Sequence, residues 1–311
     1  MSICPKGQDL RRPIPRRDLL AFLAASVLSA SRCSSPTQNV VVFHAGSLTP
    51  LIRELGRRFE GNNPHTRILS EPSGSLDAIR KITELGRHCD IIATADHRLL
   101  SRFIVPMFSD RYYELLGNEI VLATARPDIF SSSPKAWPQE WHRRIDHLTF
   151  GLSDPVRDPA GYFTHLVWKL AEIHYQSPGL YKHLVSRIDQ RWVRPKSSEL
   201  IALLQTNHLD TAFVYRSTAI QHKLKYLPLP PQISLGDPAY ASHYQRVAVR
   251  VGSEKNYLEI DGAPIRAGVA LLSPDNTPAQ SFLDYMFTEE SINLLPRMGY
   301  TRIPVQEISL Y

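Results

Sequence analysis

The feature that most constrains the fold is a repeated alternation of short apolar strands with amphipathic helices. Residues 40–43 are a run of strand formers, and apolar residues at helical spacing follow them. The first part of the chain is predicted to form strands at 40–43, 66–70, 90–95 and 119–124, with helices at 51–59 and 76–85. This rhythm is typical of a parallel sheet with helices on both faces. The sequence therefore predicts an α/β fold.

The middle of the chain begins a similar pattern afresh. Here the pattern predicts strands at 148–152, 211–215, 246–251 and 265–272, and helices at 162–175, 198–205 and 279–295. The simplest organisation is two α/β lobes, in which 40–123 and 245–311 form lobe 1 and 124–244 form an inserted lobe 2. A cleft between two such lobes is the expected ligand site.

Residues 1–33 have the order of an export signal, because a basic region precedes a short apolar stretch and small residues. The arginine pair at 16–17 resembles a twin-arginine signal. Cys33 precedes a polar tether, 34–39, and is a candidate for lipid attachment, although Arg32 fits such a cleavage site poorly. The alternative is a frayed cytosolic N-terminus. We expect an exported protein, periplasmic or anchored to the outer face of the membrane.

The charge of the chain does not indicate a nucleic-acid surface. The 36 basic and 30 acidic residues give a net charge of +6, of which the leader 1–33 carries six basic and two acidic residues. The remaining 278 residues therefore carry only about +2, and no polyanion partner is predicted. No apolar run reaches the roughly 18 residues of a spanning helix, which excludes a multi-span membrane protein.

Two bends with the same chemistry follow the first two predicted strands. Gly46-Ser47 follows the first strand, and Ser73-Gly74-Ser75 follows the second. Glycine lets a ligand approach the backbone, serine offers a hydroxyl, and the next helix offers unpaired N–H groups. Ligands of open α/β sheets bind beyond the carboxyl ends of the strands, so two such bends would form a cage for an oxyanion. The alternative is that each serine only caps its helix.

These bends belong to a longer series of motifs. The series includes residues 44–48, 73–75, 80–86, 90–96, 118–123, 153–162, 194–200, 212–217 and 221–222. In this order it resembles the molybdate/tungstate-binding component of ATP-binding-cassette importers, in its archaeal-type branch, over almost the whole chain after the tether. The resemblance implies a two-lobed periplasmic-binding-protein fold, type II-like, that closes on a tetrahedral oxyanion and delivers it to a membrane permease. It implies a monomer with no cofactor besides the molybdate or tungstate ligand.

The resemblance also implies roles for individual residues. Ser47 and Ser75 would hydrogen-bond the oxyanion, helped by backbone N–H groups around Gly46 and Gly74. Asp158 matches an aspartate that ligates the metal of the anion in the archaeal-type branch. That branch has a glutamate where this sequence has Val214, so expansion from four to six coordination is in doubt here. Tyr215 instead matches the bacterial branch, in which a tyrosine hydroxyl donates to a tetrahedral anion.

Asp158 poses an electrostatic problem. A carboxylate about 4 Å from a dianion is repelled by about 8 kcal/mol at an effective dielectric constant near 20. Several hydrogen bonds of roughly 1.5 to 3 kcal/mol would not comfortably offset this. Asp158 must therefore ligate the metal, carry a proton, or turn away to cap the helix that begins near Gly161.

Two classes of function stay open on the sequence. The first is a binding protein for molybdate or tungstate, with sulfate as the alternative anion. The second is an enzyme that uses Asp158 as a base in the cleft. The sequence has no nucleophile elbow, Walker loop or His-Glu-x-x-His motif, which argues against the enzyme.

Overall fold

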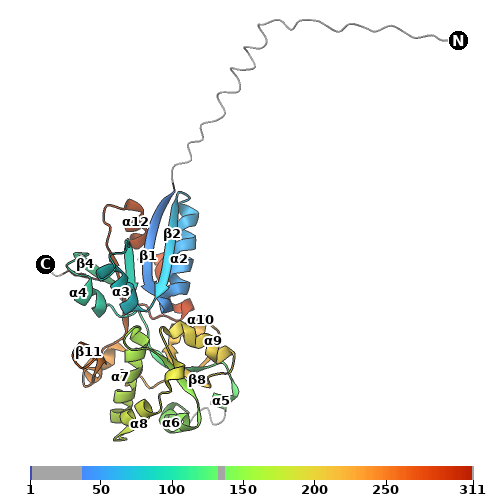
Figure 1. Cartoon of the computed structure of the whole chain (residues 1–311), viewed down its shortest axis with the longest axis vertical. Helices are drawn as coiled ribbons and strands as arrows, with labels where there is room; N and C mark the ends of the chain where they lie inside the picture. The colour runs from blue at the N-terminus through green and yellow to red at the C-terminus, as the bar shows by residue number, and fades with distance from the viewer. Residues whose placement is uncertain (2–36, 132–136, 310–311) are drawn as a thin grey trace. The chain divides into compact units, whose positions relative to one another are not determined.

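The computed structural model describes residue 1, residues 37–131 and residues 137–309 (Figure 1). The chain divides into Met1–Thr37 and Gln38–Tyr311, and the fold described below is that of the second unit. The predicted export signal, the arginine pair and Cys33 lie outside the described residues. Strand β1 begins at Gln38, inside the predicted tether 34–39.

A six-stranded sheet forms the core of lobe 1 (Figure 1). Its strands in spatial order are β13 (Gln306–Ser309), β4 (Arg111–Gly117), β12 (Arg266–Leu271), β3 (Ile91–Thr94), β1 (Gln38–Ala45) and β2 (Thr66–Ser73). Strand β1 is parallel to β2 and β3, as predicted, but β12, β4 and β13 run antiparallel to their neighbours. The expectation of a wholly parallel sheet was wrong, because the returning strand β12 enters from the other lobe.

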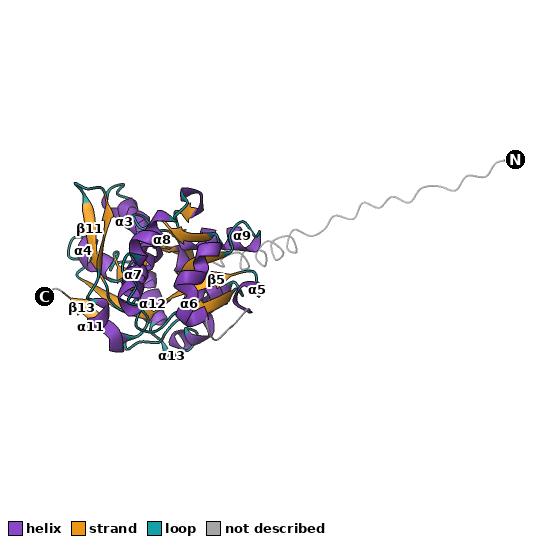
Figure 2. Cartoon of the chain, turned by 90° about the horizontal axis from the view of Figure 1, so that it is seen from below, coloured by secondary structure: helices purple, strands orange, loops and turns teal. Residues whose placement is uncertain are grey.

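Helices pack against both faces of this sheet; Figure 2 distinguishes the helices, strands and loops of the fold by colour. They are α2 (Thr49–Asn62), α3 (Ser75–Thr83), α4 (Arg98–Phe103), α12 (Thr277–Met286) and α13 (Glu289–Ile292). The chain moves from β1 to β2 in one direction and from β2 across to β3 in the other. Right-handed crossovers in opposite directions put α2 and α3 on opposite faces. Strand β1 is buried on both faces, which explains its unbroken run of apolar residues.

A five-stranded sheet forms the core of lobe 2. Its strands in spatial order are β7 (Val193–Arg194), β6 (Phe150–Ser153), β8 (Thr211–Tyr215), β5 (Ile120–Thr124) and β9 (Lys225–Pro228). The helices of this part of the chain are α5 (Asp128–Ser131), α6 (Trp137–Arg144), α7 (Pro159–His174), α8 (Leu180–Ser186), α9 (Leu200–Gln205), α10 (Arg216–Gln221) and α11 (Ala241–Tyr244). Edge-to-face contacts among Trp141, Trp168, Phe150 and Phe213 fill its interior.

The chain changes sheets earlier than the sequence suggested. Strand β5 pairs with β8 and β9, so the predicted boundary at residues 123 and 124 falls inside a strand of lobe 2. The first crossing is instead at residues 118–119, between β4 and β5. On the return, β10 (Ala248–Gly252) and β11 (Tyr257–Asp261) form a separate two-stranded sheet after residue 245. The chain rejoins the six-stranded sheet at β12.

The predicted closing helix over 279–295 is interrupted. Helix α12 ends at Met286, and Thr288 adopts an extended conformation. The Thr288 hydroxyl accepts a hydrogen bond from the backbone N–H of Ser291 and thereby starts the short helix α13. The apolar periodicity continued through this break, so spacing alone did not reveal it.

Candidate functional site

The two serine-bearing bends lie side by side in lobe 1. Strands β1 and β2 are parallel, and Ala45 is in register with Ser73. Gly46 and Ser47 follow β1 in a turn of 3-10 helix, and Gly74 follows β2 directly before α3. Both bends are therefore at the carboxyl edge of the sheet, where the crossovers change direction and ligands of open sheets bind.

The hydroxyl of Ser75 is held in a defined orientation. Ser75 is fully buried, and its Oγ accepts a hydrogen bond of 3.0 Å from the backbone N–H of Ala95. Its own proton is therefore left to donate to another group. Ser75 is the first residue of α3 and makes no capping bond, so the capping alternative does not account for its side chain.

The hydroxyl of Ser47 makes no hydrogen bond with any described residue. The side chain is 5% exposed, and only the backbone carbonyl is engaged, as an acceptor from the Tyr300 hydroxyl at 2.8 Å. No capping bond is formed by Ser47 at the start of α2 either. The hydroxyl groups of both predicted serines are therefore available to donate a hydrogen bond to a ligand.

Asp158 caps helix α7 in lobe 2. Its Oδ1 accepts a hydrogen bond from the N–H of Ala160 at 3.4 Å, and its Oδ2 accepts one from the N–H of Ser197 at 2.6 Å. The side chain is 3% exposed. Burial raises the pKa of the Asp158 carboxyl above its ordinary value, although the two backbone N–H groups oppose this rise. The capping role considered for this residue is therefore observed.

Tyr215 presents a buried hydroxyl that has no partner. The residue ends β8, is 1% exposed, and its Oη makes no hydrogen bond with a described residue. Burial, together with the nearby carboxylates of Asp158 and Asp96, raises the pKa of Tyr215 well above its ordinary value. The group is therefore a neutral hydrogen-bond donor. Val214 lies in a separate apolar cluster with Leu204 and Ala219, so it has no polar role.

Three serines that the sequence reasoning did not select complete this region. The hydroxyls of Ser73, Ser153 and Ser197 are buried and unpartnered among the described residues. Ser153 and Ser197 lie close enough to the Asp158 carboxylate to lower its pKa, yet neither makes a well-aligned hydrogen bond with it. Buried hydroxyls are normally hydrogen-bonded. A group of buried hydroxyls without hydrogen-bond partners therefore indicates a binding site for a polar ligand.

A signal for these residues was present in the sequence. Ser153 ends β6 just as Ser73 ends β2, and Ser197 stands in a turn directly before α9. Each therefore repeats the strand-end or helix-start position that identified Ser47 and Ser75.

Contacts between the lobes close this region. The Tyr162 hydroxyl of α7 donates a hydrogen bond of 2.8 Å to Oδ2 of the buried Asp96 in lobe 1. The backbone N–H of Leu76 donates to the carbonyl of Arg157 at 3.3 Å. A Cβ added to Gly74 would lie 2.2 Å from that same carbonyl oxygen. Glycine at position 74 therefore permits the close approach of the two lobes.

The nearby cations are already paired with carboxylates. Arg98 binds Asp96 at 2.7 Å, and Lys196 lies 3.7 Å from Glu199. The arrangement therefore offers neutral hydroxyls and amides to a guest. Across residues 37–131 and 137–309, no group of three or more His, Cys, Asp or Glu side chains could hold a metal ion. In the same residues, no helix is long and apolar enough to cross a membrane.

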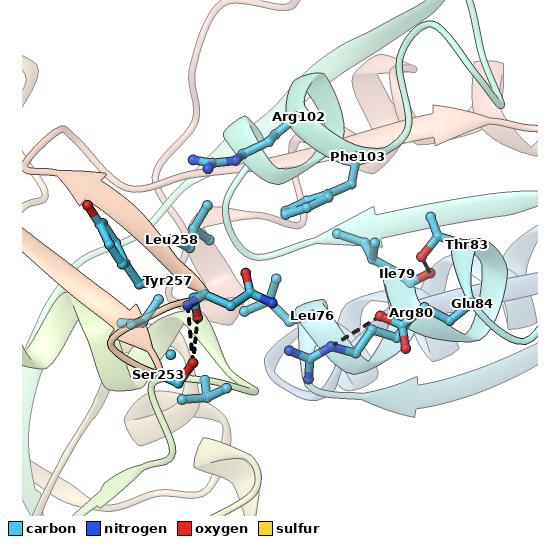
Figure 3. A pocket seen from close by; sticks show the side chains of 14 residues that line it. Leu76, Ile79, Arg80, Thr83, Glu84, Arg102, Phe103, Ser253, Tyr257 and Leu258 are labelled. Carbon is cyan, nitrogen blue, oxygen red and sulfur yellow. Dashed lines mark hydrogen bonds and ion pairs between the residues drawn. The ribbon is translucent and has the colours of Figure 1, made fainter.

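A separate pocket of about 370 Å³ lies between α3 and the β10–β11 hairpin (Figure 3). Leu76 and Ile79 line it on the α3 side, and Tyr257 and Leu258 line it on the hairpin side. None of the serines described above lines this pocket. Its lining combines apolar side chains with charged ones such as Arg80, Glu84 and Arg102, and it is separate from the region between the bends.

Comparisons with known proteins identify the family and the fold of this chain. The model of the bacterial extracellular solute-binding protein family matches residues 40–301. The chain is 33% identical over 310 residues to the molybdate/tungstate-binding protein WtpA of Thermococcus kodakarensis, covering 88% of this chain and 87% of that one. It is 35% identical over 293 residues to an uncharacterized solute-binding protein of Petrotoga mobilis, covering 92% and 89%.

Solved structures share the fold. The periplasmic molybdate-binding protein of Azotobacter vinelandii matches with a TM-score of 0.58 at 16% identity, over 85% of this chain and 99% of that one. The sulfate-binding protein SubI of Mycobacterium tuberculosis also matches with a TM-score of 0.58, at 11% identity, over 86% and 87%. The predicted two-lobed α/β fold is therefore confirmed.

Proposed function

The chain belongs to the family of bacterial extracellular solute-binding proteins, and on that premise we propose that it captures molybdate or tungstate for an ATP-binding-cassette importer. One observation carries the proposal. Unpartnered buried hydroxyls from both lobes, including that of Tyr215, accompany the two bends that bear Ser47 and Ser75. Such a set of donors suits a group that only accepts hydrogen bonds, as an oxyanion does.

Ser47, Ser75 and Tyr215 are the proposed side-chain donors to the anion. The N–H groups around Gly46 and Gly74 would add backbone donors at the same edge of the sheet. Neutral donors in a buried site can hold a dianion without fixed positive charge, because each charge-assisted hydrogen bond contributes about 1.5 to 3 kcal/mol.

Sequence similarity favours molybdate or tungstate over sulfate. The molybdate-binding and sulfate-binding structures match this fold equally well, so the fold does not separate the two anions. The related proteins from Thermococcus kodakarensis and Pyrococcus abyssi are 33% and 32% identical to this chain, and both are named molybdate/tungstate-binding proteins. The sulfate-binding protein is 11% identical.

Asp158 as a ligand of the metal in the anion stays a prediction. Both carboxylate oxygens already accept backbone hydrogen bonds, and the position of Val214 supplies no second carboxylate. We therefore favour a four-coordinate anion with Tyr215 as the donor from lobe 2. X-ray absorption of bound molybdate tests this: a tetrahedral spectrum supports it, and a six-coordinate spectrum that becomes tetrahedral in Asp158→Asn contradicts it.

We propose transport without catalysis. A serine nucleophile needs an adjacent base. The imidazole of His44, which precedes Gly46 and Ser47, is engaged by Ala45 and Ser70 rather than by either serine. The expected partner is a permease in the cytoplasmic membrane, the expected location is outside that membrane, and the expected state is a monomer.

Calorimetry with molybdate, tungstate, sulfate and phosphate on the purified chain tests the proposal. We expect tight binding of the first two anions with no turnover. Binding of sulfate or phosphate alone would overturn the assignment. Equilibrium binding to the Ser47→Ala and Ser75→Ala variants then tests whether the anion occupies the proposed site.

A further inference from the structure

An ion pair between Arg157 and Asp77 joins the two lobes beside the proposed anion site. The Nε and Nη2 atoms of Arg157 lie 2.9 Å and 2.8 Å from Oδ2 of Asp77. Arg157 is in the loop between β6 and α7 of lobe 2, and Asp77 is in the first turn of α3 in lobe 1. The pair is therefore a contact between the two lobes.

The same two segments carry residues of the proposed site. Asp77 follows Ser75 by two residues, and Arg157 immediately precedes Asp158. Between them, the Leu76 N–H donates to the Arg157 carbonyl, which also lies against Gly74. A separation of the lobes that opened the site would therefore pull Arg157 away from Asp77.

Ser47, Ser75, Asp158 and Tyr215 are at most 5% exposed, so in this arrangement their side chains are shielded from solvent. An anion held by these side chains would therefore leave when the lobes separate. The ion pair is partly exposed, with 44% of the Arg157 side chain and 20% of the Asp77 side chain accessible. Water can therefore reach the pair while the anion is still enclosed.

We propose that Arg157 and Asp77 form a latch that slows release of the anion without touching it. The inference rests on the proposed function. The guanidinium group is held by Asp77, so its charge favours the closed arrangement of the lobes rather than the capture of the anion. An exposed pair of this kind contributes modestly, and its loss should accelerate release roughly two- to fivefold.

Stopped-flow kinetics with molybdate tests the latch in the Arg157→Gln and Asp77→Asn variants of the full chain. We expect faster dissociation in both, an unchanged association rate, and an unchanged thermal midpoint of the anion-free protein. The double variant should release no faster than either single variant, because each already breaks the pair. High salt should bring the wild-type dissociation rate toward that of the variants, because it screens partly exposed charges.

The pair between Arg126 and Asp210 is a matched control. Its atoms are 2.8 Å apart, its side chains are 44% and 22% exposed, and both residues flank strands of the five-stranded sheet in lobe 2. Arg126→Gln should leave both rate constants unchanged and lower the midpoint of free and bound protein equally. Asp77 also lies 3.5 Å from Arg80, so Arg157→Gln is the cleaner of the two latch variants.

The outcomes separate the two proposals. Unchanged dissociation in Arg157→Gln, or a slower association instead, would overturn the latch while the anion assignment stands. If sulfate binds and molybdate does not, the same comparison is made with sulfate, so that the latch is judged apart from the anion. A wild-type chain that binds none of the four anions would overturn the proposed function and the latch with it.

Discussion

The hydroxyl oxygen of Ser75 and the backbone nitrogen of Ala95 are 3.0 Å apart, so the end of strand β3 orients the side chain at the start of α3. This bond occupies an acceptor position of Ser75 and leaves the proton free. Ser47 has no equivalent bond. The two serines should therefore respond differently to the same substitution.

Ser75→Ala should lower the free energy of unfolding by about 1 to 3 kcal/mol, because the buried Ala95 N–H loses its acceptor. Ser47→Ala should change it by less than about 0.5 kcal/mol. Both should weaken molybdate binding by about ten- to a hundredfold, the equivalent of one charge-assisted hydrogen bond. Urea unfolding and calorimetry measure the two effects, and equal destabilisation by both variants would contradict the first expectation.

Tyr215→Phe should weaken binding without weakening the fold. The Tyr215 hydroxyl makes no hydrogen bond with a described residue, so its removal deletes no hydrogen bond of the fold. We expect an unchanged or higher thermal midpoint and about tenfold lower affinity for molybdate. A lower midpoint with unchanged affinity would place the hydroxyl outside the site.

Gly74→Ala should hinder closure of the lobes. The backbone of Gly74 has φ −64° and ψ 149°, which alanine adopts readily, but the new Cβ would lie 2.2 Å from the Arg157 carbonyl. Overpacking of this kind costs about 1 to 3 kcal/mol, so affinity should fall about tenfold or more while the midpoint of the free protein stays close to wild type.

The Gly46→Ala variant serves as a comparison for Gly74→Ala, with the affinity for molybdate measured by equilibrium titration of both. Its Cβ would lie 3.2 Å from the Ser198 hydroxyl, a side chain that can rotate away. We expect a smaller loss of affinity than for Gly74→Ala. The reverse order would show that the Gly74 contact does not control closure.

Asp158→Asn should change how stability depends on pH. Burial raises the pKa of Asp158 in the folded chain above its unfolded value, so the folded state binds this proton more tightly. The resulting stability is present at low pH and is lost as the pH rises through the folded pKa.

The Asp158→Asn variant should therefore gain stability relative to wild type as the pH is raised from the ordinary aspartate pKa through the higher pKa of Asp158 in the folded chain. The gain is about 1.4 kcal/mol for each pH unit between the two pKa values. Urea unfolding of the anion-free proteins over this range measures it. Parallel curves for the two proteins would contradict the expectation.

Acid should destabilise the fold through buried histidines. Burial lowers the pKa of His44 and of His165 to about 4, so the folded state holds both rings neutral. The stability they contribute is complete above pH 6.5 and is lost as the pH falls toward 4, by about 3 kcal/mol for His44. His44→Asn should flatten this part of the dependence of the unfolding free energy on pH.

Local patterns were sufficient for much of the fold. Most of the predicted strands coincide with observed ones, because a buried strand needs an unbroken apolar run and an exposed turn needs glycine or a polar residue. The antiparallel pairing of β12 with β3 could not be predicted, because it joins segments about 175 residues apart. The break at Thr288 also escaped prediction, since a capping bond depends on side-chain geometry.

The candidate site also has features that the sequence predicted and features that only the tertiary structure shows. Ser47, Ser75 and Tyr215 were selected from motifs. Ser153 and Ser197 stand at equivalent strand-end and helix-start positions, but only the three-dimensional structure shows that their hydroxyls are buried without a partner among the described residues. Burial without a partner is a property of the packed chain and has no signature in the order of residues.

The sequence by itself determined the α/β class, the serine-bearing bends and the resemblance to oxyanion-binding proteins, because these depend on residue type and short-range spacing. Only the tertiary structure decided that Asp158 caps α7, that Val214 faces an apolar cluster, and that Arg157 reaches Asp77 across the lobes. Those outcomes depend on long-range packing, which sets the burial and partners of each charge.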